Sequence, residues 1–166
     1  MSKKIIAPIA AGVLLAMAGA AQAATKTSSF NVTASVAKNC IISAANLNLG
    51  VFDGTNNLAA SSNILVRCTN LTGYSVSLSP GSGVFGNRTM VSGTNSLIYN
   101  LYTDNTYGTV WGDGTGTTGV VSDIGSGMGI AGEKTHTVFG RLLASANGGS
   151  VDAGAYSDTI TATITY

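Results

Sequence analysis

The strongest constraint on the fold is the alternation of apolar and polar residues near the C-terminus. From position 160 the even residues are apolar and the odd residues are threonine, in the order Ile160, Thr161, Ala162, Thr163, Ile164, Thr165, Tyr166. Successive side chains of a β-strand point to opposite faces, whereas a helix repeats every 3.6 residues, so this order predicts a half-buried strand. The apolar face of such a strand has to be covered, by the chain itself or by a partner.

The same period of two recurs along much of the chain. It is clear at residues 30–36 and 74–78, and runs rich in aromatic and branched side chains lie at 97–103 and 136–143. Shorter strand candidates are residues 47–52, 63–68 and 107–111, and the C-terminal candidate extends back to 156. Turn dipeptides separate these runs. About eight strands without a convincing helix predict an all-β fold, an immunoglobulin-like β-sandwich.

Glycine is concentrated in one stretch, with nine glycines between positions 108 and 132. This stretch lies between strand candidates, so we expect a long surface loop or an irregular hairpin rather than a linker between domains. Four apolar residues could anchor it to the core: Trp111, Val120, Val121 and Ile124.

Residues 1–23 have the layout of an export signal. Lys3 and Lys4 precede an apolar run of 14 residues, and Ala21-Gln22-Ala23 provides small residues for cleavage. A bilayer span needs about 20 apolar residues, so an uncleaved anchor is the weaker alternative. We therefore expect an exported chain that starts at Ala24 and has no membrane span after processing.

The charge composition argues against a nucleic-acid partner. Only 9% of the residues are charged, and the mature part has six basic against seven acidic residues, a net charge of −1. These charges are scattered singly, whereas nucleic-acid binding needs clustered Lys and Arg. We therefore expect no nucleic-acid partner.

The usual catalytic and metal-binding motifs are missing. His136 is the only histidine and has no Gly-x-Ser-x-Gly motif beside it. Gly127, Gly129 and Gly132 match a dinucleotide fingerprint, but no helix follows them. Three aspartates are too far apart for a local calcium loop: Asp104, Asp113 and Asp123. We therefore expect a non-enzymatic protein with no catalytic residue, cofactor or metal site.

Two cysteines, Cys40 and Cys68, lie in the mature part. An even count in an exported chain, with no set of metal ligands nearby, predicts one disulfide. The bridge would close a loop of 29 residues, which stabilises the fold by roughly 3–4 kcal/mol. Two free thiols are the alternative.

Several segments, taken in order, resemble the spore coat protein U family, which includes the major subunits of archaic (Csu-type) chaperone–usher pili. The resemblance extends over nearly the whole mature chain. It rests on Asn39-Cys40, on the segments Leu-Asn-Leu-Gly-Val-Phe at 47–52 and Ile-Leu-Val-Arg-Cys-Thr at 64–69, on residues 97–104 with Trp111-Gly112-Asp113-Gly114, on Phe139-Gly140-Arg141, and on residues 154–160.

The resemblance implies an incomplete sandwich that lacks its final strand. Residues 24–38 would form an N-terminal donor-strand extension and residues 39–166 the pilin-like domain. A hydrophobic groove beside the C-terminal strand would be filled by a periplasmic chaperone during secretion and by the extension of a neighbouring pilin in the fibre. The groove and chaperone edge would comprise Ile160, Ala162, Ile164 and Tyr166, and the donor residues would be Phe30, Val32, Ala34 and Val36.

In function, the resemblance implies a pilus subunit that passes through the periplasm and an outer-membrane usher to the cell surface. Roles in adhesion and biofilm formation follow from that assignment. From periodicity alone, residues 30–36 could equally be an ordinary first strand.

Two other classes remain. One is a secreted coat or matrix protein with a self-contained sandwich. The other is a carbohydrate-binding or enzymatic domain that uses Trp111 and the tyrosines as a binding platform.

Overall fold

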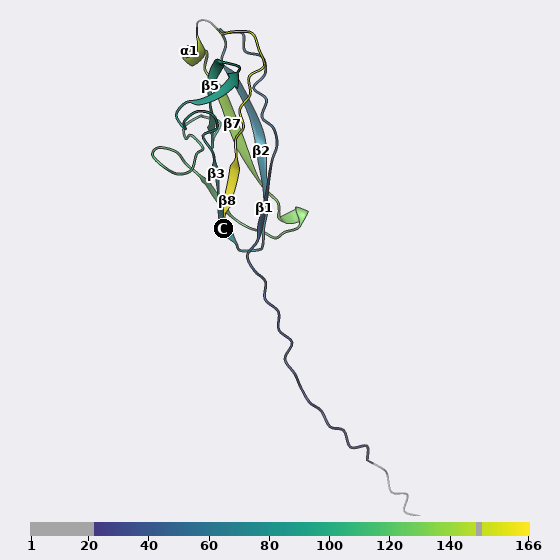
Figure 1. The fold of residues 1–166 in the computed structure, drawn as a ribbon. Helices are drawn as coiled ribbons and strands as arrows, with labels where there is room; N and C mark the ends of the chain where they lie inside the picture. The colour runs from purple at the N-terminus through teal and green to yellow at the C-terminus, as the bar shows by residue number, and fades with distance from the viewer. Residues whose placement is uncertain (1–21, 149–150) are drawn as a thin grey trace, which may run out of the picture. The chain divides into compact units, whose positions relative to one another are not determined.

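Two antiparallel sheets form the fold in a computed structural model that describes residues 22–148 and 151–166 (Figure 1). All the strand pairs are antiparallel, and the sheets are immunoglobulin-like in arrangement. The larger sheet has the order β1 (Cys40–Ala44), β2 (Leu58–Cys68), β7 (Lys134–Leu142), β5 (Asn95–Tyr102), β4 (Arg88–Ser92). The smaller sheet has the order β6 (Val121–Ile124), β3 (Gly73–Leu78), β8 (Ala162–Thr165).

Helical structure among the described residues is limited to two short turns, η1 (Ile130–Gly132) and α1 (Ala144–Asn147). The chain divides into two compact units, with the boundary between Ser35 and Val36. The described part of the first unit, residues 22–35, has no regular secondary structure. The second unit contains both sheets.

The core lies between the sheets and follows the period of two in each strand. In β3 the buried residues Tyr74, Val76 and Leu78 alternate with less buried serines. Trp111 is fully buried, and its indole Nε1 donates a hydrogen bond to the Val76 carbonyl at 2.9 Å. The ring therefore anchors the glycine-rich stretch to the core, as the sequence predicts. Its burial removes Trp111 as a surface platform for a carbohydrate.

Four of the predicted strands are present. The candidates at 63–68, 74–78, 97–103 and 136–143 correspond to β2, β3, β5 and β7, although β2 begins five residues earlier. Three strands were missed: β1 and β4, which lie at the edges of the larger sheet, and β6, which lies inside the glycine-rich stretch. All three have five residues or fewer, too few to display a period clearly.

Other expected strands are not assigned as strands. Residues 107–111 form only isolated bridges, through Val110 and Trp111, and residues 30–36 and 47–52 form none. In the C-terminal candidate the strand is restricted to β8, because residues 156–161 have only a single bridge, at Ser157. A strand requires a hydrogen-bonded neighbour, and residues 47–52 have no such bonds, whereas residues 156–161 have them only at Ser157 and Thr161.

A buried arginine connects the two sheets and was not predicted. Arg88, on β4, is 0% exposed. Its guanidinium donates to the Ser79 carbonyl at 2.9 and 3.1 Å, to the Trp111 carbonyl at 2.7 Å and to Asn100 Oδ1 at 2.7 Å. These acceptors come from β5, from the end of β3 and from the glycine-rich stretch. Arg88 therefore fixes segments that are far apart in the sequence.

We expect Arg88→Met to lower the free energy of unfolding by about 3 kcal/mol, because it leaves buried acceptors without a donor. The matched control is Arg67→Met. Arg67 forms a partly exposed ion pair with Glu133 at 3.6 Å, and its loss should cost less than about 1 kcal/mol. Denaturant unfolding of both variants measures the difference, and equal losses would contradict the role assigned to Arg88.

Candidate functional site

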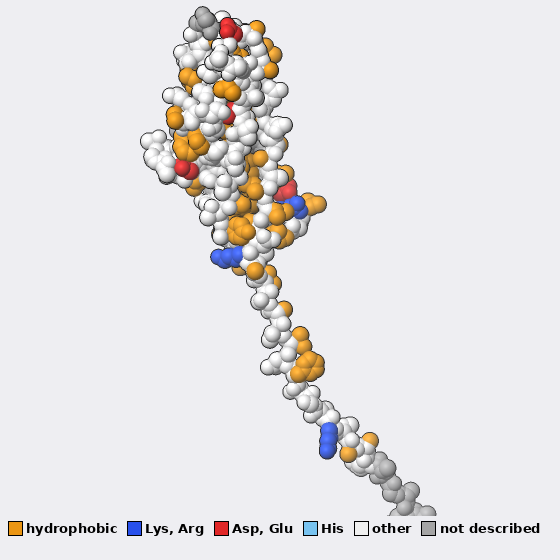
Figure 2. Space-filling model, viewed as in Figure 1, with side chains coloured by type: hydrophobic (Ala, Val, Ile, Leu, Met, Phe, Trp, Pro, Cys, Tyr) orange, Lys and Arg blue, Asp and Glu red, His pale blue; other side chains and the backbone are white. Residues whose placement is uncertain are grey.

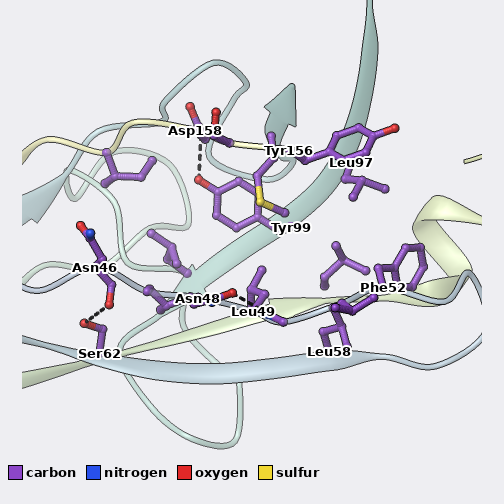
Figure 3. A pocket seen from close by; sticks show the side chains of 18 of the residues that line it. Asn46, Asn48, Leu49, Phe52, Leu58, Ser62, Leu97, Tyr99, Tyr156 and Asp158 are labelled. Carbon is purple, nitrogen blue, oxygen red and sulfur yellow. Dashed lines mark hydrogen bonds between the residues drawn. The ribbon is translucent and has the colours of Figure 1, made fainter. Parts of the chain in front are cut away.

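An apolar groove of about 1040 Å³ opens between the two sheets (Figure 3). One wall is formed by residues 44–54, which follow β1, and the other by residues 151–162, which lead into β8. The floor consists of buried core side chains, including Ile64, Leu78, Leu97, Leu101 and Leu142. Figure 2 shows hydrophobic side chains reaching the surface of the sandwich among uncharged polar atoms.

After β1, the chain of the first wall separates from β2 at Ala45. The Ala45 amide donates to the Asn63 carbonyl at 3.0 Å, and Ser62 Oγ donates to the carbonyls of Ala45 and Asn46 at 2.8 and 3.1 Å. Beyond this point the wall is held by its side chains. Leu47 and Leu49 pack against the core, and a Cβ at Gly140 would lie 2.9 Å from Leu47. The missing side chain at position 140 therefore makes room for this wall.

The second wall is anchored through Asp158. Its carboxylate accepts hydrogen bonds from the Tyr99 hydroxyl at 2.7 Å and from the Ser82 amide and hydroxyl at 3.0 and 2.9 Å. Burial and the bond to Asp158 raise the pKa of Tyr99 well above its ordinary value, so this hydroxyl remains a donor. Figure 3 shows Tyr99 reaching Asp158 across the groove floor. Thr161 is held on the same side by Ser79, whose amide donates to the Thr161 carbonyl and whose hydroxyl accepts from the Thr161 amide, both at 2.9 Å.

The two walls are not joined to each other. Among the described residues, no backbone hydrogen bond links 45–54 to 151–162. The groove therefore combines an apolar floor with backbone groups that lack a strand partner. Such an arrangement can accept one more extended segment, which would pair with the free edges and bury its alternate side chains.

The predicted groove residues lie in different environments. Ile160 and Ala162 line the groove. Ile164 packs against the core opposite Val76 of β3, and Tyr166 is 51% exposed. The sequence prediction did not include the first wall, although the alternation of Leu47 and Leu49 marked it. Tyr99 and Asp158 were not singled out, and nothing local in the sequence connects them.

The predicted donor residues lie on a segment without regular structure. Residues 22–39 contain no strand, and the side chains of Phe30, Val32, Ala34 and Val36 are exposed. Their role stays a prediction. The predicted signal segment, residues 1–23, lies almost entirely outside the described residues.

The disulfide prediction is confirmed. Cys40 and Cys68 are bonded, with an S–S distance of 2.00 Å, and they are cross-strand partners of β1 and β2. Just before the bridge, the Asn39 amide donates to Thr69 Oγ1 at 3.2 Å, and the Asn39 carbonyl accepts from the Thr69 amide at 2.9 Å. The chain is therefore fixed to the sandwich from Asn39 onward.

His136 has a structural environment. It lies on β7, and its Nε2 is 2.8 Å from the Tyr74 hydroxyl of β3, so the pair connects the two sheets. Burial lowers the pKa of His136 and raises that of Tyr74 to about 12. Asp123 and Lys134 are the charged groups that act on this histidine.

The other weak motifs occupy turns. Asp104 and Asp113 accept hydrogen bonds from nearby loop residues. Gly127 has φ of +120° and belongs to a loop that leads to η1. Within the described ranges, no three His, Cys, Asp or Glu residues are grouped as metal ligands, and no helix is long and apolar enough to cross a membrane.

The fold and groove define the class as an incomplete immunoglobulin-like β-sandwich. Residues 26–163 match the family model of the Spore Coat Protein U domain, so the chain belongs to that family. No protein of curated function matches it.

Among solved structures, the chain is similar to a chain of the CsuC–CsuE chaperone–tip adhesion subunit pre-assembly complex from the archaic chaperone–usher Csu pili of Acinetobacter baumannii. The TM-score is 0.57 and the sequence identity 23%. The alignment covers 79% of this chain but only 40% of the other. At a sequence identity this low, the similarity is evidence for the fold alone.

We expect the stability of the sandwich to fall as the pH drops below about 6.5. The pKa of His136 is lower in the folded state than its ordinary value of 6.5. The unfolded chain therefore binds the proton more readily, so this contribution is complete above 6.5 and declines as the pH falls toward the folded-state pKa.

His136→Gln should remove this pH dependence, whose slope cannot exceed about 1.4 kcal/mol per pH unit for one proton. Denaturant unfolding at several pH values measures it. Carboxyl groups with lowered pKa values, such as Asp104 at about 2, titrate at lower pH than His136 and do not contribute to this slope. If the free energy of unfolding of His136→Gln depended on pH as steeply as that of the unaltered chain, another group would be responsible.

Proposed function

We propose that the chain is a structural subunit of a surface pilus that assembles by donor-strand exchange. The observation that carries this proposal is the open groove, which lies between two walls without a shared hydrogen bond and is floored by the core. Membership of the Spore Coat Protein U domain family supports it. The similar solved chain comes from a chaperone–subunit complex of a pilus, which agrees with the same assignment.

The donor is residues 24–38 of a neighbouring subunit. Phe30, Val32, Ala34 and Val36 occur at every second position and would enter the groove together. Burying a side chain as large as Phe30 contributes roughly 1.5–3 kcal/mol. A slip by one residue would place Asn31 and Thr33 in the groove instead, so the alternation itself excludes that register.

We propose that the donor strand runs antiparallel to β8, and the short distance between the donor and its own sandwich then determines how neighbouring subunits meet. Only two residues separate Val36 from Asn39, which is bonded to Thr69. A strand added antiparallel to β8 would bring Val36 to the end of the receiving sandwich that carries α1. The next sandwich could then follow end to end. Such a head-to-tail contact does not close on itself and generates a filament.

Before assembly, the same groove would be occupied by a strand of a periplasmic chaperone. Its contact edge would include Ile160, Ala162, Ile164 and Tyr166, and an outer-membrane usher would pass the subunit to the cell surface. The export signal at residues 1–23 fits this route, as does the Cys40–Cys68 bridge, because disulfides persist in the periplasm. Adhesion and biofilm formation are the roles we assign to the assembled fibre.

We expect Phe30→Asp to block fibre formation while the subunit still folds with its chaperone, because a carboxylate would enter an apolar groove. The matched control is Asn31→Asp, which places the same charge on the opposite face of the strand and should assemble. Electron microscopy and native gels measure the fibres. If both variants polymerise equally, residues 30–36 are not the donor. If Phe30→Asp unfolds even with chaperone, the segment is an internal strand of a self-contained coat or matrix protein.

We expect Ile160→Asp to abolish chaperone capture, since Ile160 lines the groove. Thr161→Asp, one position along on the exposed face, is the control and should retain the chaperone. Affinity purification of the subunit from the periplasm, with its partner identified by mass spectrometry, measures capture. Equal recovery of the chaperone with both variants would place its contact elsewhere.

A further inference from the structure

The groove and the segment proposed to enter it carry opposite charges. Three aspartates line the groove, Asp53, Asp152 and Asp158, and none of the described lining residues is Lys, Arg or His. Residues 24–38 contain Lys26 and Lys38 and no acidic residue. In a chain with so few charges, this separation of sign gives the groove an electrostatic preference for that segment.

The groove aspartates have no cationic partner in the described parts of the chain, where the one ion pair is Arg67–Glu133. Asp152 is exposed, and its carboxylate accepts one hydrogen bond, from Asn95 Nδ2 at 2.8 Å. Hydrogen bonds from Asn56, and secondarily from Thr55, hold the pKa of Asp53 far below its usual range. A carboxylate can accept up to about four hydrogen bonds, so both aspartates can still receive an ammonium group.

Asp53 and Asp152 lie at the same end of the groove. Asp53 is near the point where the first wall turns into β2, and Asp152 follows α1 at the start of the second wall. The adjacent ends of β2 and β7 are paired there, through Leu58 and Leu142. Figure 2 shows acidic atoms at the end of the sandwich that carries α1.

Lys38 reaches this end when the donor strand runs antiparallel to β8. It lies two residues after Val36, so in an extended strand it shares the inward face with the apolar donor residues. It also directly precedes Asn39, which is fixed to its own sandwich. Lys38 is therefore located at the junction between two subunits.

We propose that Lys38 of one copy of this chain pairs with Asp152 and Asp53 of the next, and that this pairing sets the register of the inserted strand. Hydrophobicity alone leaves one ambiguity, because a slip by two residues keeps the apolar face inward. Val32, Ala34 and Val36 are similar enough to exchange places. The same slip moves Lys38 by about 7 Å along the groove, away from the carboxylates. The inference rests on the proposed function and adds the partner residues and the register.

The experiment follows the polymerisation rate of the mature chain, refolded with its disulfide intact, by light scattering at low and high salt. Lys38→Glu should slow assembly roughly tenfold at low salt, because charges at the rim of an interface act mainly on association. The effect should shrink near 1 M salt, where the Debye length is about 3 Å. Asp152→Lys should slow assembly similarly, and the double variant should recover most of the rate.

Lys134→Glu is the matched control, because it makes the same charge change on β7 outside the groove lining. Thermal unfolding of each variant establishes that the fold is intact. Equal rates for Lys38→Glu and Lys134→Glu, or no recovery in the double variant, would overturn the pairing. If Phe30→Asp blocks assembly while the charge variants have no effect, only the register inference fails. If the unaltered chain forms no polymer at any salt concentration, the proposed function fails with it.

Discussion

The structure depends on two groove walls that are not hydrogen bonded to each other. Residues 45–54 and 151–162 face each other across the core without a shared backbone bond. A sandwich with its inner face open in this way exposes core side chains such as Leu97 and Tyr99 to the groove. Such a groove can bind a strand, and because an open edge is an aggregation hazard, the assembly we propose covers it with a partner at each stage.

The rest of the fold holds that groove open. Arg88 joins β4, β5 and the glycine-rich stretch through buried hydrogen bonds, and Asp158 ties the second wall to Tyr99 and Ser82. On the other side, the disulfide joins the start of β1 to the end of β2, and the first wall follows the opposite end of β1. Each wall is therefore fastened to the sandwich by its own contacts and not to the other wall. This explains why the walls can remain apart although their apolar side chains lie over a common core.

Strands that depend on the local alternation of residues could be predicted from the sequence. Features that depend on neighbours distant in the sequence could not. Alternation identified β2, β3, β5 and β7, because each buries one face over five or more residues. The same alternation at 47–52 indicated a strand where there is only a groove wall, because side-chain burial does not require a paired backbone. Arg88 shows the opposite failure: a charged residue in a short run gives no sign of burial, and its acceptors come from distant segments.

In the assembly we propose, apolar side chains supply the binding free energy and charged side chains set the register of the strand. The apolar donor positions supply binding free energy and exclude slips by one residue, but they distinguish poorly between registers two residues apart. A chain of low charge can resolve that ambiguity with a single lysine, because few other charges compete with it. Asp53 and Asp152 lie in the groove lining, whereas Arg67 and Glu133 neutralise each other at the opposite end of β2. The scarcity of charge, which argues against a nucleic-acid partner, thereby makes the few remaining charges informative about subunit joining.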